Sequence, residues 1–460
     1  MSQPPLSRPP LSRPIAAIVL AAGKGTRMKS DLHKVLHPIA GRPMLLHLAA
    51  SVAELGAERT VVVTGAGREQ VEAAVAPLGI ATAVQADQLG TAHAVLQAEA
   101  ALAGFEGDVL ILYGDVPLVS TETMRRMLDM LQAEDAPTVV VLGFRPDVPA
   151  AYGRIIADGD GRIVKMVEAK DASPSELAET LCNSGLMAVR SADLFRLLAK
   201  VGNDNAAGEY YLPDVVMLAQ GEGGFSVVTE TDADEVAGVN SRAELATVEA
   251  SWQVKRRAAA MADGVTLIAP ETVWFAHDTR IGRDVVIEPN VFFGPGVTIA
   301  DGATIRAFCH IEGASVGAQA EVGPYARLRP GAVMGAKSKI GNFVEMKKAV
   351  LGEGAKANHL SYLGDAEVGA GANIGAGTIT CNYDGFFKYR TVIGAGAFVG
   401  SNSALVAPVS IGAGAIVAAG SVVTANVEAD ALCLVRPVQT SKPGWAKRFR
   451  DAMRAKKSGR

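Results

Sequence analysis

The feature that most constrains this sequence is an aliphatic residue at every sixth position of its second half. From Val392 to Val423 the chain reads VIGAGAFVGSNSALVAPVSIGAGAIVAAGSVV, which keeps this step at Ile393, Val399, Leu405, Ile411, Val417 and Val423. An α-helix repeats about every 3.6 residues and a half-buried strand every second residue, so neither explains the period. A repeat in which each short unit adds one strand to a stack predicts a parallel β-helix of hexapeptides.

The same period extends upstream, with occasional one-residue deletions, so that it covers about 140 residues in total. Its earlier positions are Ile281, Ile287, Phe293, Ile299, Ile305, Ile311, Val316, Val322, Leu328, Met334, Ile340, Met346, Leu351, Ala357, Leu363, Val368 and Ile374. The step is lost for 13 residues between Thr380 and Ile393, around CNYDGFFKYR. A Gly/Ala-rich low-complexity stretch would not stay in phase over this distance, so we expect the periodic side chains to fill a solenoid core. We expect the interruption to leave the stack as a loop that can carry chemistry.

Composition and cysteine spacing limit the location and partners of the chain. Of its 460 residues 20% are charged and the formal net charge is −4, which indicates neither a nucleic-acid partner nor a membrane-surface partner. The four cysteines (Cys182, Cys309, Cys381, Cys433) are far apart and form no C-x-x-C pair, which is typical of free thiols in a reducing cytoplasm. The Pro-rich start MSQPPLSRPPLSRP lacks the apolar core of a signal peptide, and we expect residues 1–14 to be a disordered tail.

In the first half, short apolar runs of buried-strand type alternate with helix-like segments. The runs lie at 15–20, 60–65, 108–115 and 138–144, and helix-like segments lie at 44–55 and 91–102. This alternation predicts an α/β domain with a mainly parallel sheet. A capping box at Ser241 and Glu244 then opens a predicted helix with Leu245, Val248 and Trp252 on one face and Gly264 past its end. The predicted organisation is a tail at 1–14, an α/β domain at 15–240, a linker helix at 241–264, a β-helix at 265–436 and a basic tail at 437–460.

A glycine-rich turn, VLAAGKGTRM, directly follows the first predicted strand. Such a turn exposes backbone N–H groups that can bind phosphates. It is not a P-loop, and Met28 occupies the place of the third glycine of a dinucleotide fingerprint. A plain strand–helix turn would also fit the glycines alone. The cations Lys24, Arg27 and Lys34, which follow closely, favour a triphosphate ligand.

Further segments make a family resemblance specific. LAAGKGTRM, QADQLGTAHA and YGDVPL resemble the sugar-1-phosphate nucleotidyltransferases. With GNFVEMKK, NHLSYLGDAEVG and NIGAGTITCNYDG added, nearly the whole chain resembles the bifunctional N-acetylglucosamine-1-phosphate uridyltransferase/glucosamine-1-phosphate acetyltransferase family of bacterial cell-wall precursor synthesis. The first 14 residues and the basic tail lie outside this resemblance.

The resemblance implies a Rossmann-like nucleotidyltransferase domain, a linker helix and a left-handed parallel β-helix, assembled as a cytoplasmic homotrimer. It implies that the chain acetylates glucosamine-1-phosphate with acetyl-CoA. The chain would then transfer UMP from UTP to N-acetylglucosamine-1-phosphate and release pyrophosphate, with Mg²⁺ bound.

The resemblance also assigns residues to uridyl transfer. Arg27 and Lys34 are expected to neutralise charge on the reacting phosphates, and Asp115 and Asn240 to hold Mg²⁺, a cation that prefers oxygen ligands. The residues expected to bind UTP or UDP-N-acetylglucosamine are Leu20, Ala21, Ala22, Gly23, Lys34, Gln85, Gly90, Thr91, Tyr113, Gly114, Asp115, Gly153, Glu168, Asn183 and Asn240. Among these, Gln85, Gly90 and Thr91 are expected to read uracil, and Gly153, Glu168 and Asn183 to hold the sugar. In isolation, Asp115 also fits a turn-capping aspartate, and Glu168 and Asn183 carry no chemical signature of their own.

In the β-helix, His359 is the expected general base, because histidine titrates near neutrality and the attacking amine must lose a proton. By itself it also fits a solvated corner residue. The resemblance assigns Arg329 and Lys347 to the sugar phosphate, where surface charge is the plainer reading, and Tyr362 and Asn373 to sugar hydroxyls. The residues expected to bind acetyl-CoA are Ala376, Asn382, Tyr383, Ser401, Ala419 and Arg436.

Two other functions fit parts of this pattern. A nucleotidyltransferase with one activity could use the β-helix only for assembly, but it would need neither His359 nor the phosphate cations of the coil. A non-catalytic regulatory subunit would be expected to lose the metal ligands and the cations of the glycine turn, which are present. The sequence therefore favours the bifunctional enzyme.

Overall fold

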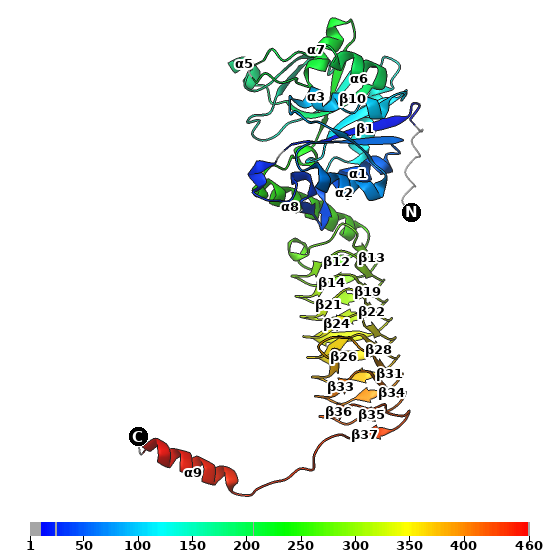
Figure 1. Cartoon of the computed structure of the whole chain (residues 1–460), viewed down its shortest axis with the longest axis vertical. Helices are drawn as coiled ribbons and strands as arrows, with labels where there is room; N and C mark the ends of the chain where they lie inside the picture. The colour runs from blue at the N-terminus through cyan, green and yellow to red at the C-terminus, as the bar shows by residue number, and fades with distance from the viewer. Residues whose placement is uncertain (1–10, 24, 206, 459–460) are drawn as a thin grey trace. The chain divides into compact units, whose positions relative to one another are not determined.

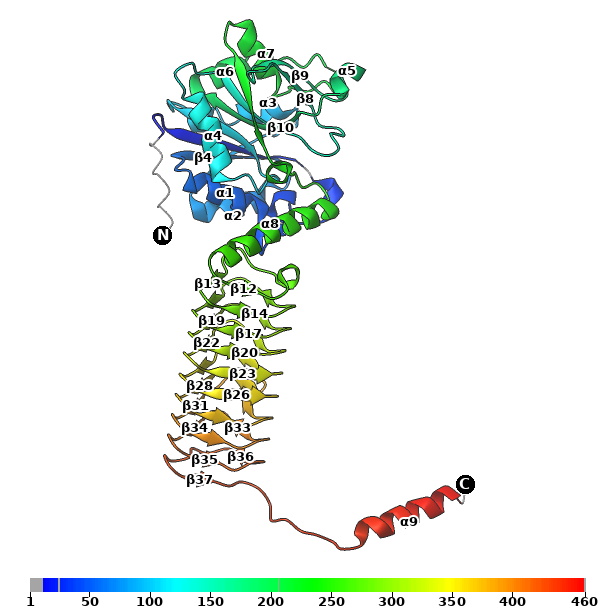
Figure 2. The same ribbon diagram turned by 180° about the vertical axis from the view of Figure 1, so that it is seen from behind.

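The computed structural model describes residues 11–23, 25–205 and 207–458. Its chain divides into two compact units, Met1–Lys255 and Arg256–Arg460 (Figure 1, Figure 2). The division falls inside α8 (Arg242–Ala262), at the place of the predicted linker helix. The finer boundaries expected at 240, 264 and 436 stay predictions. Lys24 and residues 1–10 of the expected tail lie outside the described residues.

The first unit is built on one mixed sheet with the strand order β11-β7-β10-β6-β1-β4-β5. Strands β1, β4, β5 and β6 are parallel neighbours, and β10 runs antiparallel between β6 and β7. The strands on this path are β1 (Ile15–Ala21), β4 (Arg59–Thr64), β5 (Ala81–Val84), β6 (Asp108–Tyr113), β7 (Val139–Phe144), β10 (Cys182–Arg190) and β11 (Ser226–Thr231). The short strands β8 (Arg154–Ala157) and β9 (Ile163–Val167) extend it beside β10, and β2 (Pro38–Ile39) pairs with β3 (Arg42–Pro43).

Both faces of this sheet are buried, as the continuous apolar strands predict. Ala17, Val19 and Ala21 of β1 belong to one core cluster, and Ile18 and Leu20 belong to the other. Successive residues of a strand point to opposite faces, so β1 lies at the centre of both cores. The α-helices of the unit are α1 (Met44–Glu54), α2 (Arg68–Val75), α3 (Thr91–Leu96), α4 (Thr121–Leu131), α5 (Pro174–Leu177), α6 (Ser191–Leu198) and α7 (Asp214–Gly221).

Helix α8 begins as the sequence predicts. The Ser241 hydroxyl accepts a hydrogen bond from the Glu244 backbone N–H at 3.3 Å, and the Glu244 carboxylate accepts one from the Asn240 N–H at 2.7 Å. The predicted apolar face of the helix, with Val248 at its centre, packs against the first unit in a small cluster with Ile39. The cap therefore also fixes the position of Asn240, which immediately precedes the helix.

Residues 11–14, the described part of the expected tail, contact the first unit. Arg13 forms an ion pair with the buried Asp108 at 3.0 Å, and the Asp108 N–H donates to the Pro14 carbonyl at 2.9 Å. This segment is therefore ordered against the edge of β6, a contact that no local pattern of the sequence announces.

The second unit is a stack of short parallel strands that form three faces (Figure 1). Face 1 contains β12 (Thr266–Leu267), β14 (Val286–Ile287), β17 (Thr304–Ile305), β20 (Glu321–Val322), β23 (Lys339–Asn342), β26 (Lys356–His359), β29 (Asn373–Ile374), β32 (Phe398–Val399), β35 (Ile416–Val417) and β37 (Leu432–Cys433). Face 2 contains β15 (Phe292–Phe293), β18 (His310–Ile311), β21 (Arg327–Leu328), β24 (Glu345–Lys347), β27 (Tyr362–Gly364), β30 (Ile379–Cys381), β33 (Ala404–Val406) and β36 (Val422–Val423). Face 3 contains β13 (Arg280–Ile281), β16 (Thr298–Ile299), β19 (Ala314–Val316), β22 (Ala332–Met334), β25 (Val350–Leu351), β28 (Ala366–Val368), β31 (Thr391–Ile393) and β34 (Val409–Ile411).

The side chains at the positions of the predicted six-residue period form the core of this stack. Every residue of the series from Ile287 to Val423, with Thr380 in phase, is at most 2% exposed; Ile281 at the start is half-buried. The interruption is a loop of residues 382–390 between β30 and β31, as predicted. The predicted basic tail differs from a plain disordered terminus, because it contains helix α9 (Trp445–Ser458), whose side chains are exposed. Among the described residues, no helix combines the length and the apolar character needed to cross a bilayer.

Candidate active sites

A cavity of about 320 Å³ lies at the carboxyl ends of β1 and β6. Ligands of open α/β sheets bind at this edge. Ten of the residues predicted to bind the nucleotide line it, namely Leu20, Ala21, Ala22, Gly23, Lys34, Gln85, Gly90, Thr91, Tyr113 and Asp115. The structure thus brings together four separate segments of the sequence, at 20–23, 34, 85–91 and 113–115.

Gln85 is placed to read a base edge. It is 4% exposed, and its Nε2 donates to the Gly90 carbonyl at 3.0 Å and lies 3.1 Å from His93 Nδ1. Because its amide N–H groups are used in this way, its Oε1 remains an acceptor, which suits the N3–H of uracil. Gly90 has φ +115°, and a Cβ there would lie 2.5 Å from the Tyr210 carbonyl oxygen, so only glycine fits. The sequence does not indicate His93, whose role becomes visible only through this contact.

The predicted metal ligands converge on one atom. Lys34 Nζ forms an ion pair with Asp115 and donates to Asn240 Oδ1 at 3.1 Å, and the Val239 N–H donates to the Asp115 carbonyl at 3.0 Å. One carboxylate and one amide oxygen are thus directed to the same point beside the cavity. Among the described residues, no group of three or more His, Cys, Asp and Glu side chains could hold a metal ion.

Three other predicted residues have different surroundings. Gly114 donates its N–H to the Leu20 carbonyl at 2.9 Å and so joins β1 to the end of β6. Arg27 lies in a short 3₁₀ helix (Thr26–Met28), where it is exposed and does not line the cavity. Gln88, which the sequence does not indicate, lines the cavity and donates to the Ala22 carbonyl at 2.5 Å, so it ties the glycine turn to the uracil-side loop.

The three predicted sugar residues line a second pocket of the same unit, with a volume of about 410 Å³. Gly153 and Asn183 are held together, because the Asn183 N–H donates to the Gly153 carbonyl at 2.9 Å. The residues that the sequence misses in this pocket are Arg154, Met166, Val167, Asp171, Gly202, Asp204, Asn205, Tyr211, Pro213 and Asp214. They come from β8, β9, the start of α7 and the loops between these elements, and no sequence motif predicts them.

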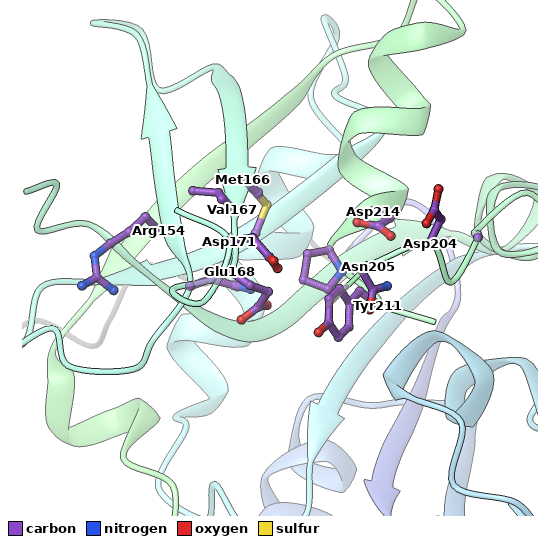
Figure 3. Close-up of a pocket in the computed structure, with 13 residues that line it drawn as sticks. Arg154, Met166, Val167, Glu168, Asp171, Asp204, Asn205, Tyr211 and Asp214 are labelled. Carbon is purple, nitrogen blue, oxygen red and sulfur yellow. The ribbon is translucent and has the colours of Figure 1, made fainter. Parts of the chain in front are cut away.

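The carboxylates of Glu168, Asp171, Asp204 and Asp214 and the hydroxyl of Tyr211 are among the groups that line this pocket (Figure 3). Glu168, Asp171 and Tyr211 point toward one another, whereas Arg154 points away from them. Burial raises the pKa of Glu168, and the carboxylates of Asp171 and Asp214 raise it further. A concave site rich in acceptors suits the O–H and N–H donors of a sugar.

Tyr113 connects the two pockets of the first unit. It lines the nucleotide cavity, and its pKa is raised by burial first and then by the charges of Asp115 and Glu168. Asp115 lines the nucleotide cavity and Glu168 lines the sugar pocket, and the charges of both act on Tyr113. The two ligand regions are therefore neighbours.

In the second unit, His359 heads a column of small residues at the corner between faces 1 and 2. Successive rungs are linked by backbone N–H donors of Gly377, Asn402 and Gly420, which bond to the carbonyls of the column at 3.3, 2.7 and 2.8 Å. Arg436 Nη1 donates to the carbonyl of Ala419, on the next rung, at 3.0 Å. The column therefore runs through His359, Ala376, Ser401, Ala419 and Arg436. The first residue is the expected base, and the other four are predicted to bind acetyl-CoA.

The predicted phosphate residues lie on face 2, one strand apart. Arg329 follows β21 and Lys347 ends β24. The pKa of Lys347 is lowered, first by the ammonium of Lys388 and then by desolvation and by Arg329, so three cations lie close together. Lys388 belongs to the loop of residues 382–390, and the sequence does not predict its approach.

Polar side chains complete this region. Glu345, which the sequence also misses, forms an ion pair with Arg329 at 2.9 Å and is in register with Tyr362 on the next strand. Asn382 is 6% exposed and its Nδ2 donates to Asp365 Oδ2 at 2.5 Å, whereas Tyr383 is 59% exposed. Asn373 lies on face 1 in β29, away from face 2. Within one chain, His359 therefore lies in the column at the corner between faces 1 and 2. Tyr362 lies on face 2, near the cations Arg329, Lys347 and Lys388.

Comparison with known proteins decides the family. A family model described as a MobA-like NTP transferase domain matches residues 17–168, and one described as bacterial transferase hexapeptide (six repeats) matches residues 278–313 and 390–425. The chain is 69% identical over 445 residues to "Bifunctional protein GlmU" of Sphingopyxis alaskensis, with 96% of this chain and 98% of that protein covered. The chain belongs to the bifunctional GlmU family.

Two further relatives of the same name agree. That of Rhizorhabdus wittichii is 73% identical over 97% of this chain and 98% of its own length, and that of Zymomonas mobilis is 59% identical over 96% and 98%. Membership of the GlmU family confirms the resemblance drawn from the sequence motifs, the Rossmann-like and left-handed β-helical fold class, and the expected activities. The chain is a bifunctional transferase of UDP-N-acetylglucosamine synthesis, with a nucleotidyltransferase half and a hexapeptide acetyltransferase half.

Proposed function

We propose that the two halves act in sequence through the residues that the cavities and the column bring together. The second unit transfers acetyl from acetyl-CoA to the amine of glucosamine-1-phosphate. The first unit then transfers UMP from UTP to the product, N-acetylglucosamine-1-phosphate, and releases pyrophosphate. The observation that carries the assignment of uridyl transfer is that one cavity is lined by residues predicted to bind the nucleotide and a second pocket by residues predicted to bind the sugar, with Tyr113 sensing the charges of both.

In uridyl transfer, the uracil lies against Gln85 and the sugar lies against Glu168 and Asn183. The sugar phosphate, already an anion, attacks the α-phosphorus of UTP, and the bond from that phosphorus to the leaving pyrophosphate breaks. Positioning and charge neutralisation supply the catalysis, because this reaction needs no covalent intermediate. Lys34 lies beside the cavity and provides the cation nearest to the phosphates. Arg27 is exposed in a short 3₁₀ helix and would add its charge once triphosphate binds.

Asp115 and Asn240 fit a Mg²⁺ ion. Their oxygens are directed to one point, which Lys34 Nζ contacts in this structure. Mg²⁺ takes one or two protein oxygens and keeps several waters, so this donor set suits it. When bound, the ion supplies positive charge to phosphate oxygens. The ammonium of Lys34 contacts the same two oxygens in this structure, and it would be available to the phosphates if these oxygens held the ion.

In acetyl transfer, His359 accepts a proton from the amine of glucosamine-1-phosphate as the amine attacks the thioester carbonyl. The new C–N bond forms, the C–S bond breaks, and CoA leaves as the thiol. Arg329, Lys347 and Lys388 bind the sugar phosphate, and Tyr362 lies on the strand next to Lys347 for hydroxyl contacts. The pantetheine arm follows the small residues below His359 to Arg436, which meets a CoA phosphate. Asn373 and the loop residues Asn382 and Tyr383 complete the predicted set.

We place this function in a homotrimer. The loop of residues 382–390 presents Phe386 (86% exposed) and Phe387 (68% exposed), which a neighbouring coil can cover. A triangular coil offers flat faces for packing about a threefold axis, so the loop of one chain can reach the column of the next. All four cysteines are free thiols, which supports a reducing compartment such as the cytoplasm.

A matched pair of variants tests the assignment. Asp115→Ala removes a metal ligand and should abolish uridyl transfer while acetyl transfer continues. His359→Ala should lower kcat of acetyl transfer by roughly 10²–10⁴-fold while uridyl transfer continues. Each product is followed separately, with glucosamine-1-phosphate and acetyl-CoA, or with N-acetylglucosamine-1-phosphate, UTP and Mg²⁺. Equal loss of both activities in either folded variant would contradict the two-site assignment.

A further inference from the structure

Asn342 lies outside the set of residues that the sequence predicts, yet its side chain contacts the proposed base. Its Oδ1 lies 2.7 Å from Nδ1 of His359. We propose that Asn342 is a positioning residue for acetyl transfer, which keeps the imidazole proton on Nδ1 so that the Nε2 lone pair faces the substrate. This inference rests on the proposed role of His359 as the general base.

The backbone fixes both partners of this hydrogen bond. Asn342 ends β23 and His359 ends β26, and the two residues are in register on adjacent strands. The next residue of each strand turns the corner in the left-handed region, Phe343 with φ 56° and Leu360 with φ 49°. The Leu360 N–H donates to the Asn342 carbonyl at 3.0 Å, which closes the rung. Asn342 therefore lies one rung before His359 along the chain, in the same corner column. The residues predicted to bind acetyl-CoA lie on the rungs that follow His359.

The chemistry of the two groups selects one tautomer. A neutral imidazole has one N–H, and an amide oxygen can only accept, so the hydrogen bond requires the proton on Nδ1. The other tautomer would set two lone pairs 2.7 Å apart. No described residue forms a hydrogen bond with Nε2, so this atom is free to take the proton of an amine. A neutral amide also differs from a carboxylate, which would stabilise the imidazolium and hold the base in its protonated form.

The surroundings of His359 contain three other charged groups. Glu321, Lys339 and Lys356 line the same cavity of about 420 Å³ on face 1. Lys339 forms an ion pair with Glu321 at 3.0 Å. None of these side chains changes in the variants below, so a change of pH profile in those variants reports on residue 342.

Acetyl transfer by the full chain is measured across pH for two substitutions. Asn342→Leu keeps the size of the side chain but removes the acceptor, and we expect kcat to fall roughly 10–100-fold. KM for glucosamine-1-phosphate should change less than about twofold, because Arg329 and Lys347 are untouched. Asn342→Asp keeps an acceptor, so it should recover most of kcat at high pH while the acid limb of the rate moves up by about one pH unit. Asn358→Leu, in the same cavity without a bond to the imidazole, is the control and should change neither.

The double variant with His359→Ala separates this inference from the function on which it rests. If Asn342 acts through His359, adding Asn342→Leu to His359→Ala should cost no further activity. A further loss there, or a fully active Asn342→Leu beside an inactive His359→Ala, would overturn the positioning role alone. A fully active His359→Ala would overturn the proposed base and the positioning role with it. The uridyl-transfer rate of each variant shows whether the chain is folded and whether equal amounts of it are present in each assay.

Discussion

The column below His359 has a length that a bulky side chain can test. Ala419 lies three strand steps from His359, through Ala376 and Ser401. Neighbouring strands are about 4.8 Å apart, so Ala419 is about 14 Å from the base along the column. Ala419 is exposed, and Ala419→Trp therefore alters the surface of the coil rather than its core.

The rates with two acetyl donors of different length test this distance. The pantetheine arm of acetyl-CoA must pass the rung of Ala419 to bring its phosphate to Arg436. Acetyl-N-acetylcysteamine is a thioester that retains only about 8 Å of that arm, so it ends before this rung. We expect Ala419→Trp to lower kcat/KM for acetyl-CoA roughly 10²-fold, or by about 2.7 kcal/mol, through lost binding. The rate with the short donor should stay close to that of the unmodified chain, with release of free thiol followed in both cases.

The same substitution at another corner is the control. Ala413 is also an exposed alanine, at the corner between faces 3 and 1 of the same coil, so Ala413→Trp should leave both donors unaffected. Equal loss with both donors in Ala419→Trp would show that the indole distorts the coil. Unchanged use of acetyl-CoA would show that the arm does not follow the column, and the reasoning from rung spacing would be refuted.

Three further changes have defined expected results. The pKa of Glu168 is raised by burial, so its ionisation opposes folding as the pH rises past the ordinary carboxyl range. In calorimetry, Glu168→Gln should therefore raise Tm of the first unit by about 1–3 °C at pH 7.5, and by less near pH 4. The same substitution should weaken binding of N-acetylglucosamine-1-phosphate. A fragment that ends at residue 255 should melt above one that ends at residue 240, because the second loses the α8 contacts of Val248. Leu405→Ala empties a fully buried position and should lower the free energy of unfolding of the β-helix by about 2–5 kcal/mol in urea titrations.

The β-helix could be predicted almost residue by residue because its core is encoded as a local period. Each rung packs only on its neighbours, so the side chain that points inward is fixed by counting along the chain. In the α/β unit the four predicted apolar runs correspond to β1, β4, β6 and β7, because buried strands are continuous apolar runs. Strands β5, β8, β9, β10 and β11 were not predicted. Helix α9 was not predicted, although Trp445, Phe449 and Met453 recur at the four-residue spacing of a helix face. These side chains are exposed and pack on no core, so the tail was interpreted from its basic charge alone.

The candidate sites were predictable only in part. Ten residues predicted to bind the nucleotide line one cavity, and the sequence indicates them because a glycine turn and a strand end have chemical meaning by themselves. The sugar pocket was predicted only at Gly153, Glu168 and Asn183. Its other polar residues, such as Asp171 and Asn205 in loops and Asp214 at the start of α7, are brought together only by the fold. The bond between Asn342 and His359 joins residues 17 positions apart, and no period of the sequence marks it as different from any other rung.

All deviations from the six-residue period occur at one corner of the coil, which is not the corner that contains His359. Every shortened step, such as Ile311 to Val316 and Met346 to Leu351, and the long step from Thr380 to Ile393, passes from face 2 to face 3. The steps from face 1 to face 2, which form the corner of His359, are six residues in every rung of the series. A ligand that contacts one atom group per rung needs an unchanging corner, whereas a loop that leaves the stack needs a corner whose length can vary. The coil therefore keeps an invariant corner at the column proposed for the acyl donor, and its insertion, with Lys388, lies at the corner beside the proposed sugar-phosphate cations.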